Sequence, residues 1–479
     1  MKYRRSNYCI FVDLDGTDKK TMMLHAYTGA MDIVQAQIAT FLKEHSMFEE
    51  EEINFSKDSL ALLIARGYIT TKSAAEEKDY VRRFAELLHK DSMRHIKGFV
   101  FMVSYDCNFR CPYCYEAGVS GNGHKWSKKT FTKEMVDRAY DAMTEIEPDE
   151  SKRYKVITLY GGEPFLKENV EVVEYMVRKG QKLGYTFEAV SNGYDLDQYK
   201  SVLSTGAILN IQITLDGARE MHDSRRFHYE TRESFDKIFH NIKLVLDHNI
   251  SVALRFNADA NNFGEIKKLE KLFRDAGYYD TNKFSLNPAL LRDEEGGVTP
   301  DSSLIENEET KNTDKKTSDN IHYINREEFN KLFQEAGLDV NHHDYGLYRM
   351  LLSALKQGSY LRFHSIFCGV QANSFILDPL GDIYTCWETV GIKKHIIGTY
   401  RNGIEWRDEI KHWRNRNIGN TPKCSNCKYA LLCGGGCMAK AMRFGKNYHA
   451  SFCDDYGSIV KMTLNRVYND WAKINASQS

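Results

Sequence analysis

The chain has 479 residues and a formal net charge of −1, so it is long enough for two or three domains with sizeable cores. Its balanced charge argues against wholesale binding to nucleic acid or to anionic membranes. It shows neither an apolar run of about 18 residues nor an N-terminal segment typical of a secretory signal. Eleven cysteines without an export signal therefore predict metal ligation in a reducing cytoplasm rather than a disulfide framework.

Residues 1–95 predict a small winged-helix-like module. Apolar stretches at Tyr8–Asp13 and Thr21–Tyr27 flank an Asp-Gly turn, which is typical of a β-hairpin. Met31–Glu44 has helical periodicity, and two further helical stretches follow it. The module could simply cap the domain that follows. Alternatively, it recognises a leader peptide by adding an extended segment to an exposed strand edge.

Residues 96–290 alternate apolar strands with amphipathic helices, which predicts an α/β fold with a parallel sheet and an active site at the strand C-termini. Arg255 interrupts an apolar strand, so it is expected to face the barrel lumen or to pair with a carboxylate. The expected strands are Gly98–Val103, Lys155–Leu159, Thr186–Val190, Leu209–Leu215, Ser251–Asn257 and Lys283–Leu286, and the main helices are Thr132–Glu145, Val170–Leu183 and Phe235–His248.

The first of these strands leads into a loop with Cys107, Cys111 and Cys114 in C-x3-C-x2-C spacing. Their thiolates can converge at the C-terminal end of the strand. Three thiolates leave one iron of a four-iron cluster open to a cofactor or substrate. A zinc site is the alternative, but it would lack its usual fourth ligand.

This spacing, with Tyr113 directly before the last cysteine, resembles the signature of the radical S-adenosylmethionine (radical SAM) enzymes. The resemblance implies a partial (β/α)6 TIM barrel. It also implies that the three cysteines hold a 4Fe-4S cluster whose open iron chelates S-adenosylmethionine (SAM). Reduction of that complex would release a 5'-deoxyadenosyl radical, so we expect the three cysteines to carry the catalysis.

Two strand ends match SAM-binding positions of the family. Gly161 and Gly162 precede Glu163, and glycines permit close approach of a ligand to backbone N–H groups. The resemblance implies that this run binds the amino group of SAM. Ser191 and Asn192 follow the next strand and would bind the ribose hydroxyls, although an Asx-type turn is the alternative interpretation.

The fourth strand ends at Asp216, and Arg225 follows shortly afterwards. This segment resembles the Asp-Gly, His-Asp and Arg run of peptide-modifying family members. We therefore expect Asp216, Arg225 and Tyr113 to contact the cofactor, with the Arg225 guanidinium bound to a carboxylate of cofactor or substrate. His222 and Asp223 could instead form an ordinary helix cap and ion pair.

Residues 291–360 are polar and aperiodic, which predicts an insertion and linker. Residues 361–479 hold seven cysteines in a pattern that resembles the iron-sulfur-binding SPASM domain of radical enzymes that act on peptides. A zinc ribbon would explain the Cys424-x2-Cys427 pair alone. The resemblance implies two auxiliary 4Fe-4S clusters, which makes three in all. One is held by Cys424, Cys427, Cys433 and Cys453, and the other by Cys368, Cys386 and Cys437.

Seven cysteines are one short of the eight thiolates that two fully ligated clusters require. The second auxiliary cluster therefore has either an open iron that binds a substrate cysteine or His364 as its fourth ligand. Cys9 is remote in sequence and is expected to be a buried strand residue.

The arrangement resembles maturases that form thioether links in ribosomally synthesised peptides, at an α carbon as in sactipeptides or at a β or γ carbon as in ranthipeptides. The expected partners are a precursor peptide with its leader and an electron donor such as flavodoxin or ferredoxin. Carbon-carbon linkage or side-chain oxidation is the enzymatic alternative. Anaerobic sulfatase maturases use an aspartate just after the cysteine that matches Cys386, whereas Trp387 and Glu388 follow it here. Glu388 is the candidate base. The non-enzymatic alternatives are an iron-sulfur electron carrier and a peptide-binding adaptor.

Overall fold

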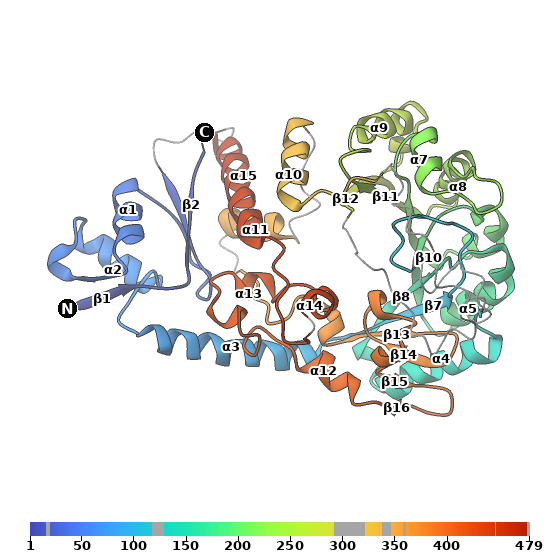
Figure 1. Cartoon of the computed structure of the whole chain (residues 1–479), viewed down its shortest axis with the longest axis horizontal. Helices are drawn as coiled ribbons and strands as arrows, with labels where there is room; N and C mark the ends of the chain where they lie inside the picture. The colour runs from blue at the N-terminus through green and yellow to red at the C-terminus, as the bar shows by residue number, and fades with distance from the viewer. Residues whose placement is uncertain are drawn as a thin grey trace. The chain divides into compact units, whose positions relative to one another are not determined.

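Contacts divide the chain into two compact units, the N-terminal unit and the barrel unit, which we describe separately (Figure 1). The N-terminal unit comprises Met1–Arg94, Asp339–Ala372 and Arg414–Ser479, and the barrel unit comprises His95–Leu338 and Asn373–Trp413. The computed structural model describes residues 1–15, 20–116, 129–291, 321–337, 346–357, 361–445 and 447–476.

The barrel unit is built on a ten-stranded sheet with the order β12-β11-β10-β9-β8-β7-β13-β14-β15-β16. The strands β7 to β12 are parallel and lie in chain order, as the alternating pattern predicted. This arrangement agrees with the α/β barrel expected from the cysteine motif. Their bounds are β7 Lys97–Ser104, β8 Arg153–Gly161, β9 Thr186–Ser191, β10 Ile208–Thr214, β11 Ser251–Ala258 and β12 Phe284–Leu290.

Amphipathic helices cover the outside of the curved sheet (Figure 1). The Thr132 side chain caps α4 by accepting a hydrogen bond from Met135 N at 3.2 Å, as Thr at this position commonly does. Tyr140 of α4 packs edge-on against Phe101 of β7, with ring centroids 5.3 Å apart. The helices of this unit include α4 Lys133–Ile146, α5 Val170–Lys182, α6 Lys200–Leu203, α7 Arg219–Arg225, α8 Phe235–Asp247, α9 Glu265–Asp275 and α10 Arg326–Glu335. The three predicted helices are confirmed as α4, α5 and α8.

Four short strands extend the sheet beyond β7, and the sequence analysis did not predict them. β13 runs parallel to β7, with Phe375 opposite Phe99 and Leu377 opposite Phe101. Because a parallel partner can come from any distance along the chain, local periodicity carries no signal for this pairing. The strands are β13 Ser374–Leu377, β14 Asp382–Tyr384, β15 Gly398–Thr399 and β16 Glu405–Trp406, and α12 Glu409–Asn415 follows them.

The N-terminal unit begins with two small antiparallel sheets, β5-β1-β6 and β2-β3-β4. The predicted hairpin is confirmed as β2 and β3, although its turn residues 16–19 lie outside the described part of the chain. The prediction of one helix over Met31–Glu44 is wrong at its start, because Met31–Val34 pairs with β3 as strand β4. The bounds are β1 Lys2–Arg5, β2 Cys9–Asp13, β3 Thr21–His25, β4 Met31–Val34, β5 Met47–Glu49, β6 Ile69–Thr70, α1 Ala36–Glu44, α2 Lys57–Ala65 and α3 Ala74–Arg94.

Cys9 is buried on β2, as predicted, and its thiol donates to Tyr68 O at 3.4 Å. Burial raises the pKa of Cys9 to about 12, so the thiol stays protonated near neutral pH. Cys9 therefore belongs to the apolar core of the module.

The C-terminal segments of this unit pack on the hairpin. α15 (Tyr456–Ala476) contacts α11 (Leu347–Gln357) and β2, and Asn465 Nδ2 of α15 donates to Asp13 O at 3.3 Å. Two short helices, α13 (Ala430–Cys433) and α14 (Met438–Gly445), carry or adjoin cysteines.

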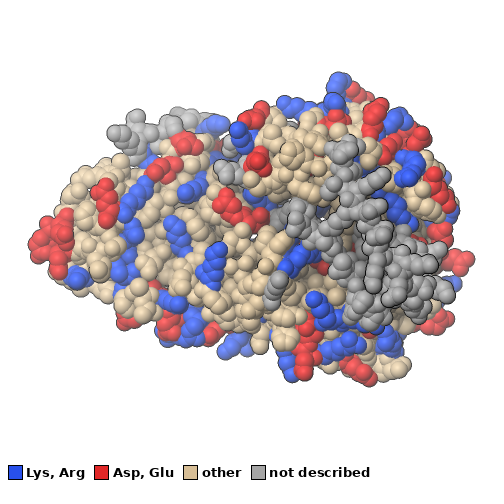
Figure 2. All heavy atoms as spheres, in the orientation of Figure 1, with Lys and Arg blue, Asp and Glu red and all other residues tan. Residues whose placement is uncertain are grey.

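The predicted insertion over residues 291–360 thus contains the helices α10 and α11, while its residues 292–320 lie outside the described part. Basic and acidic side chains mingle over the visible surface, except where acidic ones gather at the tip of the N-terminal module (Figure 2). Among described residues, no helix combines the length and apolarity needed to cross a bilayer.

Candidate active site in the barrel

The loop after β7 brings the three predicted cluster cysteines together. Arg110 Nη1 donates to Cys107 O at 2.7 Å, and Cys114 N donates to Cys111 O at 3.1 Å. Burial raises the pKa of all three thiols, and the charges of Cys111 and Cys114 contribute to the rise at Cys107. The Cys107 thiol also accepts the backbone N–H of Phe109 at 3.4 Å. Such N–H donors stabilise thiolate ligands of iron-sulfur clusters.

The two glycines at the end of β8 pack closely against the cysteine loop. A Cβ atom on Gly161 would lie 2.4 Å from Ser104 O, and one on Gly162 would lie 2.4 Å from Asp106 O. Gly162 N donates to Ser104 O at 3.0 Å. The interpretation that these glycines open backbone N–H groups to a ligand is therefore wrong for Gly162, because the backbone of the cysteine loop occupies that position.

Glu163 lies buried directly beneath this loop. Its carboxylate accepts hydrogen bonds from Phe165 N at 2.9 Å, Ser191 Oγ at 2.7 Å and Asn192 N at 2.6 Å. Burial raises the pKa of Glu163 to about 7, although these donors oppose the rise. The structure thus joins three predicted SAM-binding residues in one hydrogen-bonded group at the ends of β8 and β9.

Asn192 also forms the Asx-type turn that the sequence analysis kept as an alternative. Its Oδ1 accepts Tyr194 N at 2.9 Å, two residues further on. Its Nδ2 donates to Asn108 Oδ1 at 2.7 Å and lies 4.0 Å from the Cys107 thiol. The amide therefore links the end of β9 to the cysteine loop.

A second charged group lies at the ends of β10 and β11. The Tyr113 hydroxyl donates to Asp216 Oδ2 and accepts from Arg226 Nη1 at 3.0 Å. Arg225 is fully buried and bonds Asp216 at 3.3 Å and Asp259 at 2.8 Å. Arg225 thus uses protein carboxylates as acceptors, and Tyr113 lies within the same network.

His222 and Asp223 both have structural partners. His222 Nδ1 accepts Asp216 N at 3.2 Å, and burial lowers its pKa well below the usual range. Asp223 Oδ1 accepts Ser234 N at 2.9 Å and Phe235 N at 3.0 Å, at the start of α8. The helix-cap interpretation is therefore confirmed for Asp223.

Two residues of this lumen, Arg226 and Asn257, were not predicted as site residues from the sequence. Arg226 stands next to the predicted Arg225, and Asn257 is two positions from Arg255 on the same face of β11. Arg255 Nε donates to Asn257 Oδ1 at 2.7 Å, so its partner is an amide rather than the expected carboxylate. Strand alternation from Arg255 would have identified Asn257.

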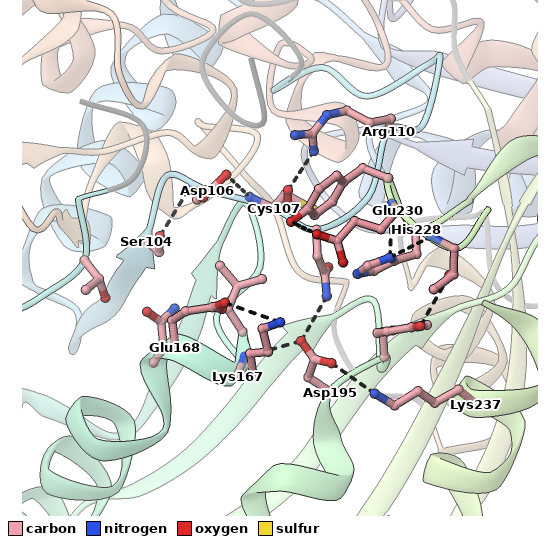
Figure 3. Close-up of a pocket in the computed structure, with 17 residues that line it drawn as sticks. Ser104, Asp106, Cys107, Arg110, Lys167, Glu168, Asp195, His228, Glu230 and Lys237 are labelled. Carbon is pink, nitrogen blue, oxygen red and sulfur yellow. Dashed lines mark hydrogen bonds and ion pairs between the residues drawn. The ribbon is translucent and has the colours of Figure 1, made fainter. Parts of the chain in front are cut away.

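A polar pocket of about 530 Å³ opens beside the cysteine loop and is lined by Cys107 (Figure 3). Asp195 is one of its lining residues and accepts hydrogen bonds from Asn108 Nδ2 at 3.0 Å, Lys167 N at 3.3 Å and Lys237 Nζ at 3.1 Å. The predicted SAM residues after β8 and β9 do not line this pocket. The pocket therefore borders the cysteine loop at a place where Glu163, Ser191 and Asn192 do not form its wall.

The C-terminal cysteines are divided between the two units. Cys386 belongs to the barrel unit and the other six to the N-terminal unit. Burial raises the pKa of Cys424 to about 12, and the charges of Cys433, Cys453 and Cys427 add to the rise. The charges of three of the predicted ligands thus act on the fourth, and their binding of one auxiliary cluster stays a prediction. His364 is exposed, and its role as a ligand stays a prediction.

Glu388 lies half-buried behind Cys386. Trp387 packs edge-on against Tyr160, with ring centroids 4.5 Å apart. Burial raises the pKa of Tyr160 well above its usual range, and the charges of Cys114, Cys386 and Glu388 act in the same direction. Tyr160 therefore lies near both the cysteine loop and the segment after β14.

Comparison with known proteins agrees with this geometry. Residues 101–270 match the family model of the radical SAM superfamily. This part of the chain is a radical SAM domain. The domain spans β8 to β11, the second half of β7 and part of α9, so it contains the cysteine loop and both charged groups of the lumen.

For one curated relative, the similarity extends beyond the radical SAM domain. The chain is 21% identical over 398 residues to the cysteine-type anaerobic sulfatase-maturating enzyme of Clostridium novyi, a match that covers 78% of this chain and 97% of the relative. It is 28% identical over 134 residues to the GTP 3',8-cyclase of Photorhabdus laumondii, which covers 28% of this chain and 36% of the relative. Native anSMEcpe, solved with bound AdoMet and the Cp18Cys peptide, superposes with a TM-score of 0.52 at 16% identity and covers 79% of this chain and 99% of the other. This structural match shows a shared fold.

Radical SAM proteins bind SAM and a 4Fe-4S cluster, and the residues of this domain fit that pair. The three thiols share one loop, a donor is already directed at the Cys107 sulfur, and a buried carboxylate lies close by at Glu163. Among the described residues, no three His, Cys, Asp or Glu side chains are placed to hold a single metal ion. A four-iron cluster distributes its cysteines over separate irons, so this finding concerns mononuclear sites.

Proposed function

We propose that this protein is a radical SAM peptide maturase that joins the sulfur of a peptide cysteine to a carbon of another residue. The observation that carries the proposal is the cysteine count, which leaves one coordination site for a substrate sulfur, and the environment of Tyr160 supports it. The charges of Cys114, a ligand of the proposed SAM cluster, and of Cys386, a ligand of the proposed incomplete auxiliary cluster, both act on this one buried phenol. Hydrogen abstraction and capture of the substrate sulfur would then take place within one lumen.

The residues around the lumen have separate roles in the proposed reaction. The bound cluster and SAM supply the hydrogen-abstracting radical. The Glu163 carboxylate binds the SAM ammonium, while Ser191 and Asn192 position the ribose side of the cofactor. Arg225 and Tyr113 act through Asp216, which they hold by hydrogen bonds. An electron donor such as flavodoxin or ferredoxin provides the reducing equivalent.

The second auxiliary cluster, on Cys368, Cys386 and Cys437, would bind the substrate thiolate at its open iron. Glu388, two residues after Cys386, would accept a proton from the peptide. A base working near neutral pH requires a tuned proton affinity, and Glu388 is half-buried. The other auxiliary cluster, on Cys424, Cys427, Cys433 and Cys453, would be fully ligated by protein.

The N-terminal module supplies a surface for the leader of the precursor peptide. Among the described strands β4 pairs only with β3, so one edge of β4 is open to another strand. The opposite edge of the sheet is β2, which α15 contacts. Ile33 on β4 and Leu62 and Ile64 on α2 are exposed apolar side chains. A leader with alternating apolar residues would extend the sheet at β4.

Side-chain oxidation of the sulfatase-maturase type is the second candidate. The match that covers 97% of the Clostridium novyi enzyme favours it. That branch uses an aspartate directly after the cysteine that matches Cys386, whereas Glu388 lies one position further along the chain. Thioether formation remains our first choice because the cysteine count leaves one coordination site for a substrate sulfur.

Anaerobic incubation with reductant, SAM and the peptide encoded beside the gene distinguishes the two. Mass spectrometry after alkylation should show loss of two hydrogen atoms per link together with loss of an alkylatable thiol. Loss of the sulfur atom itself would indicate oxidation to an aldehyde and reject thioether formation. Absence of 5'-deoxyadenosine would reject the radical mechanism, and the Cys107→Ala variant serves as the inactive control.

A further inference from the structure

Arg416 is a fully buried arginine among the C-terminal cysteine loops of the N-terminal unit. Its Nη2 donates to Gly435 O at 2.8 Å and to Ala450 O at 2.9 Å, and its Nη1 donates to Gly436 O at 3.3 Å. Gly435 and Gly436 lie between Cys433 and Cys437 in the chain, and Ala450 is three residues before Cys453. One guanidinium therefore connects two segments that carry proposed cluster ligands.

The backbone of Arg416 connects a third segment. Arg416 O accepts Gln371 Nε2 at 2.9 Å. The amide oxygen of Gln371 accepts Phe367 N at 3.1 Å, and Gln371 N donates to Cys368 O at 3.2 Å. The loop that carries Cys368 is thus attached to the same residue as the other two.

The charge of Arg416 has no counter-ion within the part of the chain that the structure describes. All three hydrogen bonds of the guanidinium go to neutral carbonyls, and the buried Nε has no acceptor among the described residues. Burial of an uncompensated cation is costly, so buried charges in proteins are normally paired. The side chains around Arg416 indicate which groups supply the counter-charge.

The groups whose negative charges act on Arg416 are cysteines, which are ionised when they bind a metal. Burial lowers the pKa of Arg416, and the charges of Cys424, Cys437, Cys368 and Cys433 oppose that fall. Cys424 and Cys433 belong to one proposed auxiliary cluster, whereas Cys368 and Cys437 belong to the other. Among the described arginines whose pKa is shifted, Arg416 alone has cysteines of both proposed auxiliary clusters among the charges that act on its pKa.

We infer that Arg416 is a shared counter-cation of the two auxiliary clusters, which raises their reduction potentials and holds their loops through the Gly435, Gly436 and Ala450 carbonyls. The inference rests on the proposed auxiliary clusters. A fixed positive charge stabilises the reduced, more negative form of a nearby cluster, and hydrogen bonds to cluster sulfurs act in the same direction. Its unpartnered Nε–H is available for such a bond. Arg416 is a positioning residue, since it acts on the peptide only through the clusters.

Arg414 provides a matched comparison two residues earlier. It is also buried, and its Nη1 donates to Val370 O at 2.9 Å and to Gly369 O at 3.2 Å. Among the cysteines, Cys368 alone has a resolved effect on its pKa. Arg414 is therefore associated with one proposed cluster and Arg416 with both, so their substitutions should have different effects.

The test uses the full chain with Cys107, Cys111 and Cys114 all changed to Ala, so that only auxiliary clusters remain. After anaerobic reconstitution we would measure iron and sulfide per chain, the electron paramagnetic resonance spectrum of the reduced protein, and both potentials by redox titration. Arg416→Met should lower both auxiliary potentials, and Arg416→Lys should lower them less because it keeps the charge. Arg414→Met should change one signal only, and Arg83→Met on the exposed face of α3 should change neither.

Unchanged potentials and spectra in Arg416→Met would overturn the inference. Circular dichroism checks folding, and if Arg416→Met unfolds, the charge-conserving Arg416→Lys variant and the neutral Arg416→Gln variant decide the matter by their difference in potential. Equal potentials in those two variants also overturn it. Absence of iron from the parent triple variant would instead overturn the auxiliary clusters of the proposed function, and the inference would fall with them.

Discussion

The hydroxyl of Tyr113 in the cysteine loop donates a hydrogen bond to Asp216 at the end of β10, although 103 residues separate the two in the chain. This bond ties the loop to the far side of the lumen. We expect Tyr113→Phe to reduce the free energy of unfolding by about 1 to 3 kcal/mol, because a buried carboxylate loses a donor. Chemical denaturation of the protein measures this loss. Tyr154→Phe, at a half-exposed ring of β8, should leave stability unchanged, and equal effects of the two variants would contradict the prediction.

Gly162→Ala should release the cysteine loop from the end of β8. The new Cβ would meet Asp106 O at 2.4 Å and Tyr105 O at 2.8 Å, and both are backbone atoms that cannot rotate away. Such overpacking costs about 1 to 3 kcal/mol. We expect iron bound by the loop to fall, measured in a variant that lacks the C-terminal cysteines. Gly264→Ala is the control, because a Cβ there has no neighbour within 4 Å, and full iron content in Gly162→Ala would refute the packing argument.

The affinity for SAM should depend on pH through Glu163. Burial raises the pKa of this carboxyl to about 7, so it is increasingly protonated below that pH and must lose a proton to bind the SAM ammonium. Affinity should therefore weaken as pH falls below about 7, by at most about tenfold per pH unit. Anaerobic calorimetry would measure it.

Glu163→Gln is the matched variant for this experiment. It cannot ionise, so its SAM affinity should be lower than that of the parent at pH 8 and nearly constant with pH. A parent profile as flat as that of Glu163→Gln would show that Glu163 does not bind the ammonium.

Ile33→Lys should impair leader binding. Ile33 is an exposed apolar residue on the open edge strand β4, where a lysine disfavours the addition of another strand. We expect the dissociation constant of a fluorescent leader peptide to rise at least about tenfold, which corresponds to a loss of roughly 1.4 kcal/mol of binding free energy. Leu183→Lys, at an exposed leucine beside α5, is the control. An unchanged leader affinity in Ile33→Lys would locate the leader elsewhere.

Local pattern was sufficient for the barrel strands and for the cysteine loop. The apolar alternation of Ser251–Asn257 predicted β11 to within one residue of its observed end at Ala258. The spacing of Cys107, Cys111 and Cys114 likewise predicted thiols that share one loop. Both features depend on a few consecutive residues, so no distant part of the chain is needed to specify them.

Features that depend on distant residues were not accessible in this way. The close packing at Gly162 is imposed by Asp106, which lies on another strand end. The local pattern of Met31–Val34 fits a helix, and its pairing with β3 in the folded chain makes it a strand instead. Arg416 gave no signal, because its importance comes from three loops that meet around it only in the folded chain.

The pairing of β13 with β7 also determines how the chain can be divided. Ser374–Leu377 lies along the outer edge of the first barrel strand, and Phe375 stacks on Phe99 with ring centroids 5.9 Å apart. A fragment that stops at residue 290 contains the whole matched radical SAM region but leaves β7 with unpaired backbone groups and an uncovered phenylalanine. Exposed edges of this kind promote self-association. The radical SAM region of this protein is therefore completed by a segment that follows α10 in the chain, so during synthesis the sheet cannot close over β7 until residues near 377 have been made.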